Sequence, residues 1–319
     1  MPVAADAPLQ VLSRVREKLA SRARRISGRV GAELADFAGG IGKMLRARFA
    51  LELGRALGVS GDAAEAAACA VEWVHNASLL HDDCVDGAAV RRGGPTPNSL
   101  FGQSTALLLG DLAFSQGLEE AVSISPNAAT HLVTAVREMT IGELQEEFLR
   151  GSLDVTPQAY LGVAARKTGA LFEWCGNVFS ELSPLDLGRS DPPRLSLTAG
   201  ILLQIVDDIQ DLTLDPDVSG KKQGMDLEAR RLSLPIVMAL KEEKARKAFA
   251  EAWSRPGPLP SGDSAVLNRA VVEAGGLAQA ADLARESLAS IMAMIRLLPD
   301  REGAASLESF VAEMARRQF

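Results

Sequence analysis

The spacing of apolar residues constrains the fold of this chain more than any other feature of its sequence. Leucine, alanine, valine and isoleucine recur every three or four residues over long stretches, as on the buried face of an amphipathic helix. The alternation of β-branched residues that is typical of strands is nearly absent. The helical segments are 11–25, 45–57, 63–81, 104–124, 128–149, 159–181, 195–212, 233–253, 265–274 and 277–298. We therefore predict an all-α protein with about ten helices.

Composition excludes several classes of protein. With 319 residues, of which 47% are hydrophobic, the chain is able to bury a substantial core. It carries 34 Lys and Arg against 41 Asp and Glu, and the basic residues are scattered, so no nucleic-acid partner is expected. Cys69, Cys84 and Cys175 form no Cys-x-x-Cys pair, which argues against a disulfide scaffold or a zinc site. Without a secretory signal or a long apolar run, we expect a soluble, cytoplasmic protein with no transmembrane segment.

Three carboxylates follow a nearly apolar helical segment, at Asp82, Asp83 and Asp86. On a helix, Asp82 and Asp86 lie one turn apart on one face, with Asp83 beside them. Like charges at this spacing destabilise a helix by roughly a few tenths of a kcal/mol per pair, so a compensating cation is expected. A divalent metal ion would provide it.

The same acidic pattern recurs at Asp207, Asp208 and Asp211, again after an apolar helical segment. A single cluster is as readily explained by a solvated helix end or a cap, but two clusters favour a functional site. They could face each other across a cavity. Because Mg²⁺ binds through one or two carboxylates together with the phosphate oxygens of its substrate, we predict a substrate that carries phosphate.

Basic residues next to glycines accompany the acidic clusters. Lys43 and Arg46 stand at i and i+3 after Gly42, where a helix is expected to begin. The stretch 91–94, Arg-Arg-Gly-Gly, follows the first cluster, and 220–224, Gly-Lys-Lys-Gln-Gly, follows the second. Each stretch alone is typical of a solvated surface. An acidic cluster followed by a basic glycine loop, seen twice, indicates a site for metal and diphosphate.

These motifs resemble those of the trans-isoprenyl diphosphate synthases, the polyprenyl synthetase family, from about residue 39 to residue 240. The family's aspartate-rich motifs are matched at 82–86 and 207–211, its Gly-Lys-x-x-Arg segment at 42–46, and its Lys-Thr pair at 167–168. Met44 and Ala47 depart from the pattern, since the family usually has arginine at the first of these positions and proline is common at the second.

The resemblance implies an isoprenoid synthase-type bundle of about ten or more helices around a central catalytic cavity. The whole chain, 1–319, would be a single polyprenyl synthetase domain that forms a homodimer. It would be an Mg²⁺-dependent prenyltransferase, with about three Mg²⁺ ions per active site, that condenses isopentenyl diphosphate head to tail with an allylic diphosphate. Charge stabilisation on the departing pyrophosphate would be the main catalytic effect, and no dedicated general base is expected.

The resemblance also implies a role for each matched residue. The residues expected to take part in catalysis are Asp82, Asp83, Asp86, Arg91, Lys167, Asp207 and Lys221. The metal site would comprise Asp82, Asp86, Asp207 and Asp211, the last acting, like Asp83 and Asp208, through water or as a supporting group. Arg91, Lys167 and Lys221 would hold the allylic diphosphate, and Lys43, Arg46, His75 and Arg92 isopentenyl diphosphate. Thr168 and Gln204 would line the reacting centre, and Arg231 replaces a lysine near the leaving group.

Product length is expected to depend on residues that precede Asp82 on its helix. Ala77 and Ser78 are small where short-chain synthases of the family frequently have aromatic residues, so the cavity floor is open at this turn. Trp73 stands one turn further from Asp82, four residues before Ala77, and is large enough to stop a growing chain. Alternatively, it packs against a neighbouring helix. We predict a linear all-trans product of about twenty to twenty-five carbons.

Several alternative functions are less well supported. A class I terpene cyclase shares the first acidic motif, but its second metal motif is absent here, and it needs no second diphosphate site such as Lys43, Arg46 and Arg92 would form. A head-to-head synthase usually has Asp-x-x-x-Asp pairs, and a non-catalytic subunit of a heteromeric synthase typically lacks one acidic motif. The Glu72-x-x-His75 pattern is found in di-iron bundles, but no second copy exists in this sequence.

Overall fold

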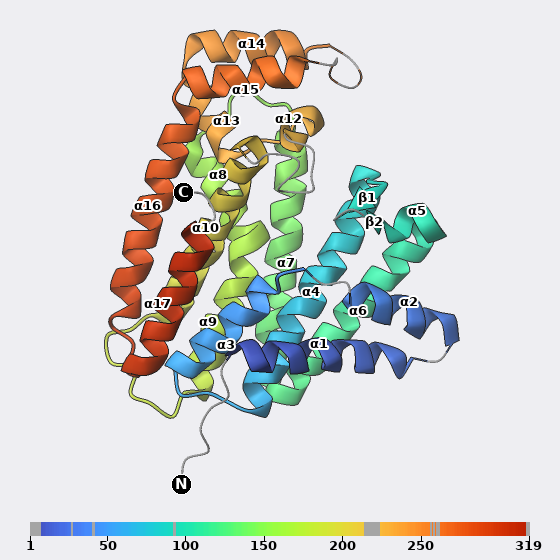
Figure 1. The fold of residues 1–319 in the computed structure, drawn as a ribbon, viewed down its shortest axis with the longest axis vertical. Helices are drawn as coiled ribbons and strands as arrows, with labels where there is room; N and C mark the ends of the chain where they lie inside the picture. Colours follow the sequence, from blue (N-terminus) through green and yellow to red (C-terminus); the bar gives the residue numbers. More distant parts are fainter. Residues whose placement is uncertain are drawn as a thin grey trace. The chain divides into compact units, whose positions relative to one another are not determined.

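The computed structural model describes residues 8–26, 28–39, 42–91, 94–213, 224–255, 257, 259 and 262–316. Among these residues the only strands are β1 (Val90–Arg91) and β2 (Gly94–Pro95), which pair antiparallel (Figure 1). The prediction of an all-α protein is confirmed. None of the described helices is both long enough and apolar enough to cross a lipid bilayer.

Contacts divide the chain into two compact units. The first comprises Met1–Val136, Trp174–Pro193 and Arg296–Phe310, and the second comprises Arg137–Glu173, Arg194–Ile295 and Val311–Phe319. This division does not test the single domain expected over 1–319, which stays a prediction.

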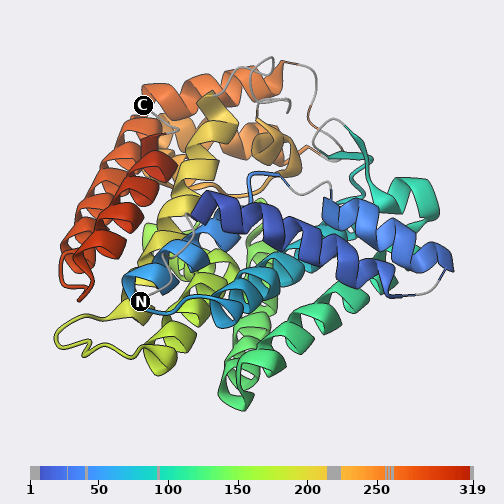
Figure 2. The same cartoon turned by 60° about the horizontal axis from the view of Figure 1, so that its bottom comes forward.

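The first unit is built around one long helix, α4 (Asp62–Asp86), which is rich in alanine and largely buried. Its other helices are α1 (Pro8–Arg24), α2 (Gly28–Gly39), α3 (Leu45–Ala56), α5 (Pro97–Phe101), α6 (Gln103–Ile124), the start of α7 (Pro126–Leu149), the end of α9 (Ala170–Leu182) and the start of α17 (Arg301–Arg316). Helix α4 packs against α1, α3 and α6, with α1 lying across α4 in both views (Figures 1 and 2).

Helices α4 and α6 are in close contact because α6 has glycine where the two meet. A Cβ atom at Gly117 would lie 2.9 Å from Val74 Cγ2, and one at Gly110 would lie 2.4 Å from His81 Nε2. Helix α4 ends where Gly87 adopts the left-handed conformation, with φ at 63°. This packing therefore holds the end of α4 that carries the first acidic cluster.

The second unit contains most of α10 (Pro192–Thr213), from Arg194 onward, and this part carries the second acidic cluster. Its other elements are the end of α7, α8 (Pro157–Ala164), the π-helix η1 (Ala165–Gly169), the start of α9, α12 (Met225–Ala229), α13 (Leu234–Ala239), α14 (Glu243–Trp253), α15 (Asp263–Glu273), α16 (Gly276–Ile295) and the end of α17. Elements η1 and α10 lie so close together that a Cβ atom at Gly200 would be 2.7 Å from Gly169 Cα.

Two predicted helices differ from those in the structure. The segment predicted over 159–181 contains the π-helical turn η1 between α8 and α9. The single helix predicted over 233–253 is wrong, because the chain turns after α13 and begins α14 at Glu243. All six residues of α13 are buried, whereas α14 is amphipathic, so the two segments need different surroundings although their apolar spacing is similar. Helices α2, α5, α12 and α17 were not among the predicted segments.

The close approach at Gly200 predicts opposite effects for two glycine substitutions in the second unit. Gly200→Ala should lower the free energy of unfolding by about 1–3 kcal/mol, because the new methyl group meets the backbone of Gly169. Gly162→Ala should raise it by roughly 0.5–1 kcal/mol, because Gly162 lies within α8 and no atom lies within 4 Å of the position that its new methyl group would take. Urea or thermal unfolding measures the free energy of unfolding of both variants. A loss of stability in both would contradict the expectation that only Gly200 is in close contact with a neighbouring backbone.

Candidate functional site

The first acidic cluster buries one of its three aspartates and leaves the other two accessible. Asp83 is 1% exposed, and its Oδ1 accepts a hydrogen bond from Arg91 Nε at 2.7 Å. Asp82 is half-buried and Asp86 is exposed, and both occupy the same face of the last turns of α4. The buried carboxylate thus binds the chain's own arginine, while the other two remain accessible.

The segment after the first cluster is hydrogen-bonded to the C-terminal end of α4 and to the residues that follow it. Asn98 Nδ2 donates to Asp83 O at 3.1 Å and to Ala88 O at 3.0 Å, and Thr96 Oγ1 donates to the same Ala88 oxygen at 2.6 Å. These bonds hold Arg91 beside the acidic cluster. Arg92, expected to bind isopentenyl diphosphate, lies outside the described residues.

The second acidic cluster repeats this arrangement on α10. Asp207 is exposed and Asp211 half-buried, whereas Asp208 is only 4% exposed. Asp208 Oδ2 accepts hydrogen bonds from the Tyr160 hydroxyl and, at 2.7 Å, from the amide of Leu234; Oδ1 accepts one from Gln204 Nε2 at 2.8 Å. In both clusters the second aspartate is therefore buried and bonded within the fold, whereas the first and fifth are exposed or half-buried.

Burial controls the ionisation of this network. It raises the pKa of Asp208 to about 7, although the hydrogen bonds from Tyr160, Leu234 and Gln204 lower it. Burial and the adjacent Asp208 carboxylate also raise the pKa of Tyr160 well above its ordinary value. The hydroxyl therefore stays protonated and remains a hydrogen-bond donor to Asp208.

Asp211 connects α10 to the residues that follow the undescribed stretch 214–223. Its backbone oxygen accepts from the amide of Gly224 at 2.9 Å, and its Oδ2 accepts from the amide of Asp226 at 3.2 Å. One carboxylate oxygen of Asp211 is thus used to bind a backbone amide. This is compatible with the supporting role expected for Asp211. Lys221, expected to bind the allylic diphosphate, lies outside the described residues.

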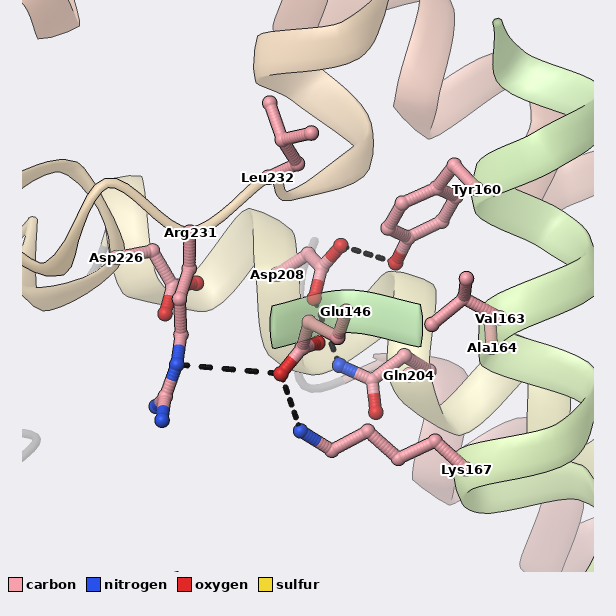
Figure 3. Close-up of a pocket in the computed structure, with 10 residues that line it drawn as sticks. All are labelled: Glu146, Tyr160, Val163, Ala164, Lys167, Gln204, Asp208, Asp226, Arg231 and Leu232. Atoms are coloured by element: carbon pink, nitrogen blue, oxygen red, sulfur yellow. Dashed lines mark hydrogen bonds and ion pairs between the residues drawn. The ribbon is translucent and has the colours of Figure 1, made fainter. Parts of the chain in front are cut away.

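A cavity of ≈ 150 Å³ lies beside the buried Asp208 in the second unit (Figure 3). A chain of side-chain hydrogen bonds runs along it: Thr168 Oγ1 donates to Gln204 Oε1 at 2.7 Å, and Gln204 in turn donates to Asp208. The structure therefore brings together two residues expected to line the reacting centre. The cavity is lined by Glu146, Tyr160, Val163, Ala164, Lys167, Gln204, Asp208, Asp226, Arg231 and Leu232.

Two cations point toward one carboxylate in this cavity (Figure 3). Lys167 Nζ lies 2.5 Å from Glu146 Oε2 and 2.7 Å from Glu143 Oε2, and Arg231 Nε lies 3.9 Å from Glu146 Oε2. Lys167 is on η1, and a Cβ atom at Gly142 would lie 2.6 Å from its backbone nitrogen, so α7 and η1 are in close contact. A π-helical turn in this position is typical of functional sites.

The residues expected to bind isopentenyl diphosphate lie at the start of α3 and on α4. Arg46 Nη1 is 3.1 Å from His75 Nε2, and both side chains are half-buried. Lys43 is exposed just before α3. The structure therefore brings Arg46 and His75 into contact at the surface of the first unit.

The residues expected to set product length lie on α4 before the acidic cluster. Trp73 and Ala77 are fully buried, whereas Ser78 is half-buried and its hydroxyl donates to His75 O at 2.8 Å. Helix α6 passes close to Trp73, since a Cβ atom at Gly117 would lie 3.4 Å from its Cβ. Trp73 is thus placed where α4 and α6 are packed.

The sequence matches the family model described as Polyprenyl synthetase over residues 32–259, well over half of the chain. The chain belongs to the polyprenyl synthetase family. Geranylgeranyl diphosphate synthase of Mycobacterium tuberculosis is 33% identical over 97% of this chain and 89% of that protein. Octaprenyl diphosphate synthase of Escherichia coli is 29% identical over 82% of this chain and 81% of that protein.

A solved structure has the same fold as this polyprenyl synthetase. The crystal structure of a polyprenyl synthase from Caulobacter crescentus, complexed with calcium and isoprenyl diphosphate, matches it with a TM-score of 0.86 over 100% of both chains at 24% identity. The predicted isoprenoid synthase-type fold is confirmed. The family match and the curated relatives also confirm the predicted class, a prenyltransferase that makes prenyl diphosphates.

The oxygen donors of this polyprenyl synthetase suit magnesium. Among the described residues, no three His, Cys, Asp or Glu side chains are grouped closely enough to hold a metal ion by themselves. Asp82 and Asp86 in the first unit and Asp207 in the second instead present accessible carboxylates, the type of oxygen donor that Mg²⁺ prefers together with water and phosphate. The donor set therefore fits a metal that binds together with a diphosphate.

Sequence reasoning assigned no role to two residues that organise the cavity, Tyr160 and Glu146. Tyr160 is the chain's only tyrosine and stands seven residues before Lys167, on the same side of a helix. Glu146 stands three residues after Glu143, so both carboxylates share a face of α7. The spacing alone shows which side chains share a face, but not which helix that face meets.

The two neighbouring aspartates of α10 should respond differently to substitution. Asp208→Asn should lower the free energy of unfolding by about 2–4 kcal/mol, because it replaces a carboxylate that accepts three hydrogen bonds in a buried site. Asp207→Asn, on the exposed side of the same turn, should change it by less than about 0.5 kcal/mol. Urea unfolding tests this contrast, and equal losses in the two variants would refute the buried role of Asp208.

Proposed function

We propose that this polyprenyl synthetase condenses isopentenyl diphosphate with an allylic diphosphate, head to tail, to give a longer linear all-trans prenyl diphosphate and pyrophosphate. The observation that supports this best is the repeated acidic arrangement, in which Asp82 with Asp86 and Asp207 with Asp211 occupy accessible positions around a buried aspartate. Family membership is the ground for assigning both clusters to one reaction.

We propose that Mg²⁺ is the metal, with about three ions per active site. Asp82, Asp86 and Asp207 would hold it, with Asp211 in a supporting role. When bound, Mg²⁺ neutralises negative charge on a diphosphate leaving group. A different arrangement, such as a di-iron centre, has no support in the described residues, where Glu72 and His75 contact groups of α3 instead.

The cations of each unit would bind the two diphosphates. Lys167 and Arg231 converge on Glu146 in the cavity and would exchange this carboxylate for the allylic diphosphate, together with Arg91 and Lys221. Lys43, Arg46, His75 and Arg92 would bind isopentenyl diphosphate. Thr168 and Gln204 would lie at the reacting carbons, where their oxygen atoms tolerate a developing positive charge. Water would have to be excluded from the allylic cation, because it would quench this intermediate.

We propose that the enzyme is a homodimer in the cytoplasm. Leu108 on α6 is 67% exposed and Phe148 on α7 is 83% exposed, and each has a further exposed leucine nearby on its own helix. Exposed large apolar side chains of this kind favour burial against a second copy. The buried, free Cys69, Cys84 and Cys175 fit a reducing compartment.

We propose a product of about twenty to twenty-five carbons. The small side chains of Ala77 and Ser78 would leave room for the growing chain along α4, and Trp73 would stop it one turn further from Asp82. Its position at the close contact of α4 with α6 supports a fixed obstacle, because that packing leaves the indole little room to move aside.

The proposed reaction is tested by incubating the purified protein with labelled isopentenyl diphosphate, Mg²⁺ and dimethylallyl, geranyl or farnesyl diphosphate. Linear prenyl diphosphates should form and should disappear when EDTA removes the metal. Asp82→Ala and Asp207→Ala should each reduce turnover by about 100-fold or more, whereas Asp62→Ala, at the exposed opposite end of α4, should not. A cyclic hydrocarbon product would favour a terpene cyclase, and an inactive wild-type protein would favour a non-catalytic subunit.

The proposed floor is tested by Trp73→Ala, which should lengthen the product because it removes the largest side chain of this part of α4. Its control is Trp174→Ala, since Trp174 is equally buried and donates a hydrogen bond to Ala128 O. Both variants should lose stability, by about 3–5 kcal/mol, but only the first should change the product. Trp73→Leu and Trp174→Leu serve if the alanine variants do not fold. Unchanged product length would remove Trp73 as the floor.

A further inference from the structure

The start of α3 is held in an unusual way. Met44, the residue before the helix, adopts the left-handed conformation with φ at 48° and provides no side-chain cap. The first amides of any helix have no acceptor within the helix, so they need an acceptor from elsewhere. In α3 this acceptor comes from another helix, α4.

Glu72 supplies the acceptor. It is 1% exposed on α4, and its Oε1 accepts a hydrogen bond from the amide of Ala47 at 3.0 Å. Burying a carboxylate is costly unless donors compensate for the lost water. The positive end of the α3 dipole and the Ala47 amide provide such compensation.

One turn along α4, His75 contacts the residue next to Ala47. Arg46 Nη1 lies 3.1 Å from His75 Nε2. Glu72 and His75 share a face of α4 because they stand at i and i+3. The Glu72-x-x-His75 pair therefore holds the backbone of Ala47 and the side chain of Arg46, two consecutive residues at the start of α3.

We propose that Glu72 is a positioning residue for the binding of isopentenyl diphosphate. It touches no substrate in this scheme. By fixing the first turn of α3, it holds Arg46 against His75 and fixes the direction from which Lys43 reaches the diphosphate. The substrate named here rests on the proposed function, but the bond between Glu72 and Ala47 does not.

The test compares Glu72→Ala, Glu72→Gln and the control Glu120→Gln. Glu120 is fully buried in the same unit and pairs with Lys18 and Arg22 on α1, so its substitution perturbs a buried carboxylate away from α3. Glu72→Ala should raise the KM for isopentenyl diphosphate by about tenfold, with the KM for the allylic diphosphate changed less than about twofold. Glu72→Gln retains an acceptor oxygen and should stay within about threefold of wild type. Glu120→Gln should leave both KM values unchanged.

Hydrogen–deuterium exchange provides a readout that does not depend on activity. The peptide containing Ala47 should exchange faster in Glu72→Ala than in wild type, and Glu72→Gln should restore most of the protection. Equal changes in both KM values, or unchanged exchange at Ala47, would overturn the proposal. If Glu72→Ala does not fold, Glu72→Met, which fills a similar volume without an acceptor oxygen, replaces it in both measurements with the same expected results. If the wild-type protein makes no prenyl product, the proposed function fails, while the exchange result still tests the contact.

Discussion

The burial of one carboxylate in each acidic cluster is the interaction on which the candidate site depends. Asp83 is bonded to Arg91, and Asp208 is bonded to Tyr160, Gln204 and the amide of Leu234. A buried carboxylate with such partners fixes the rotation of its helix, because any turn of the helix would leave donors and acceptor unpaired. The first and fifth aspartates of each cluster are then held on the accessible face.

Close helix packing determines how accurately the other functional groups are placed. Glycines at 110 and 117 let α6 approach α4, and glycines at 142, 169 and 200 bring α7, η1 and α10 together around Lys167. Because each glycine lets its backbone lie against the backbone or a side chain of the facing element, these contacts leave little freedom for the helices to shift. The ion pairs of Lys167 and Arg231 with Glu146 then keep two long, flexible cations in the cavity.

Much of this arrangement follows from the sequence. Apolar spacing predicted the long helices, and the repeated Asp-Asp-x-x-Asp pattern identified both acidic clusters, because each of these signals is local. The Tyr160–Asp208 bond, the Glu72–Ala47 bond and the turn between α13 and α14 were not predicted. Each depends on which helix lies opposite, and periodicity identifies a buried face without naming its neighbour. The π-helical turn at 165–169 was likewise not predicted, and it lies where Gly142 of α7 and Gly200 of α10 approach η1.

In the proposed function, product length depends on packing along α4 before the acidic cluster rather than on the shared motifs. Curated relatives named for geranylgeranyl and octaprenyl products are 33% and 29% identical to this chain. Such similar identities to synthases of different products mean that overall likeness does not select a length. We propose that the deciding volume is local: the small Ala77 and the large Trp73 stand one turn apart on α4, which packs against α6 at Gly117. On this proposal, a change of one side chain there would alter the space for the growing chain without touching the residues proposed to bind diphosphate.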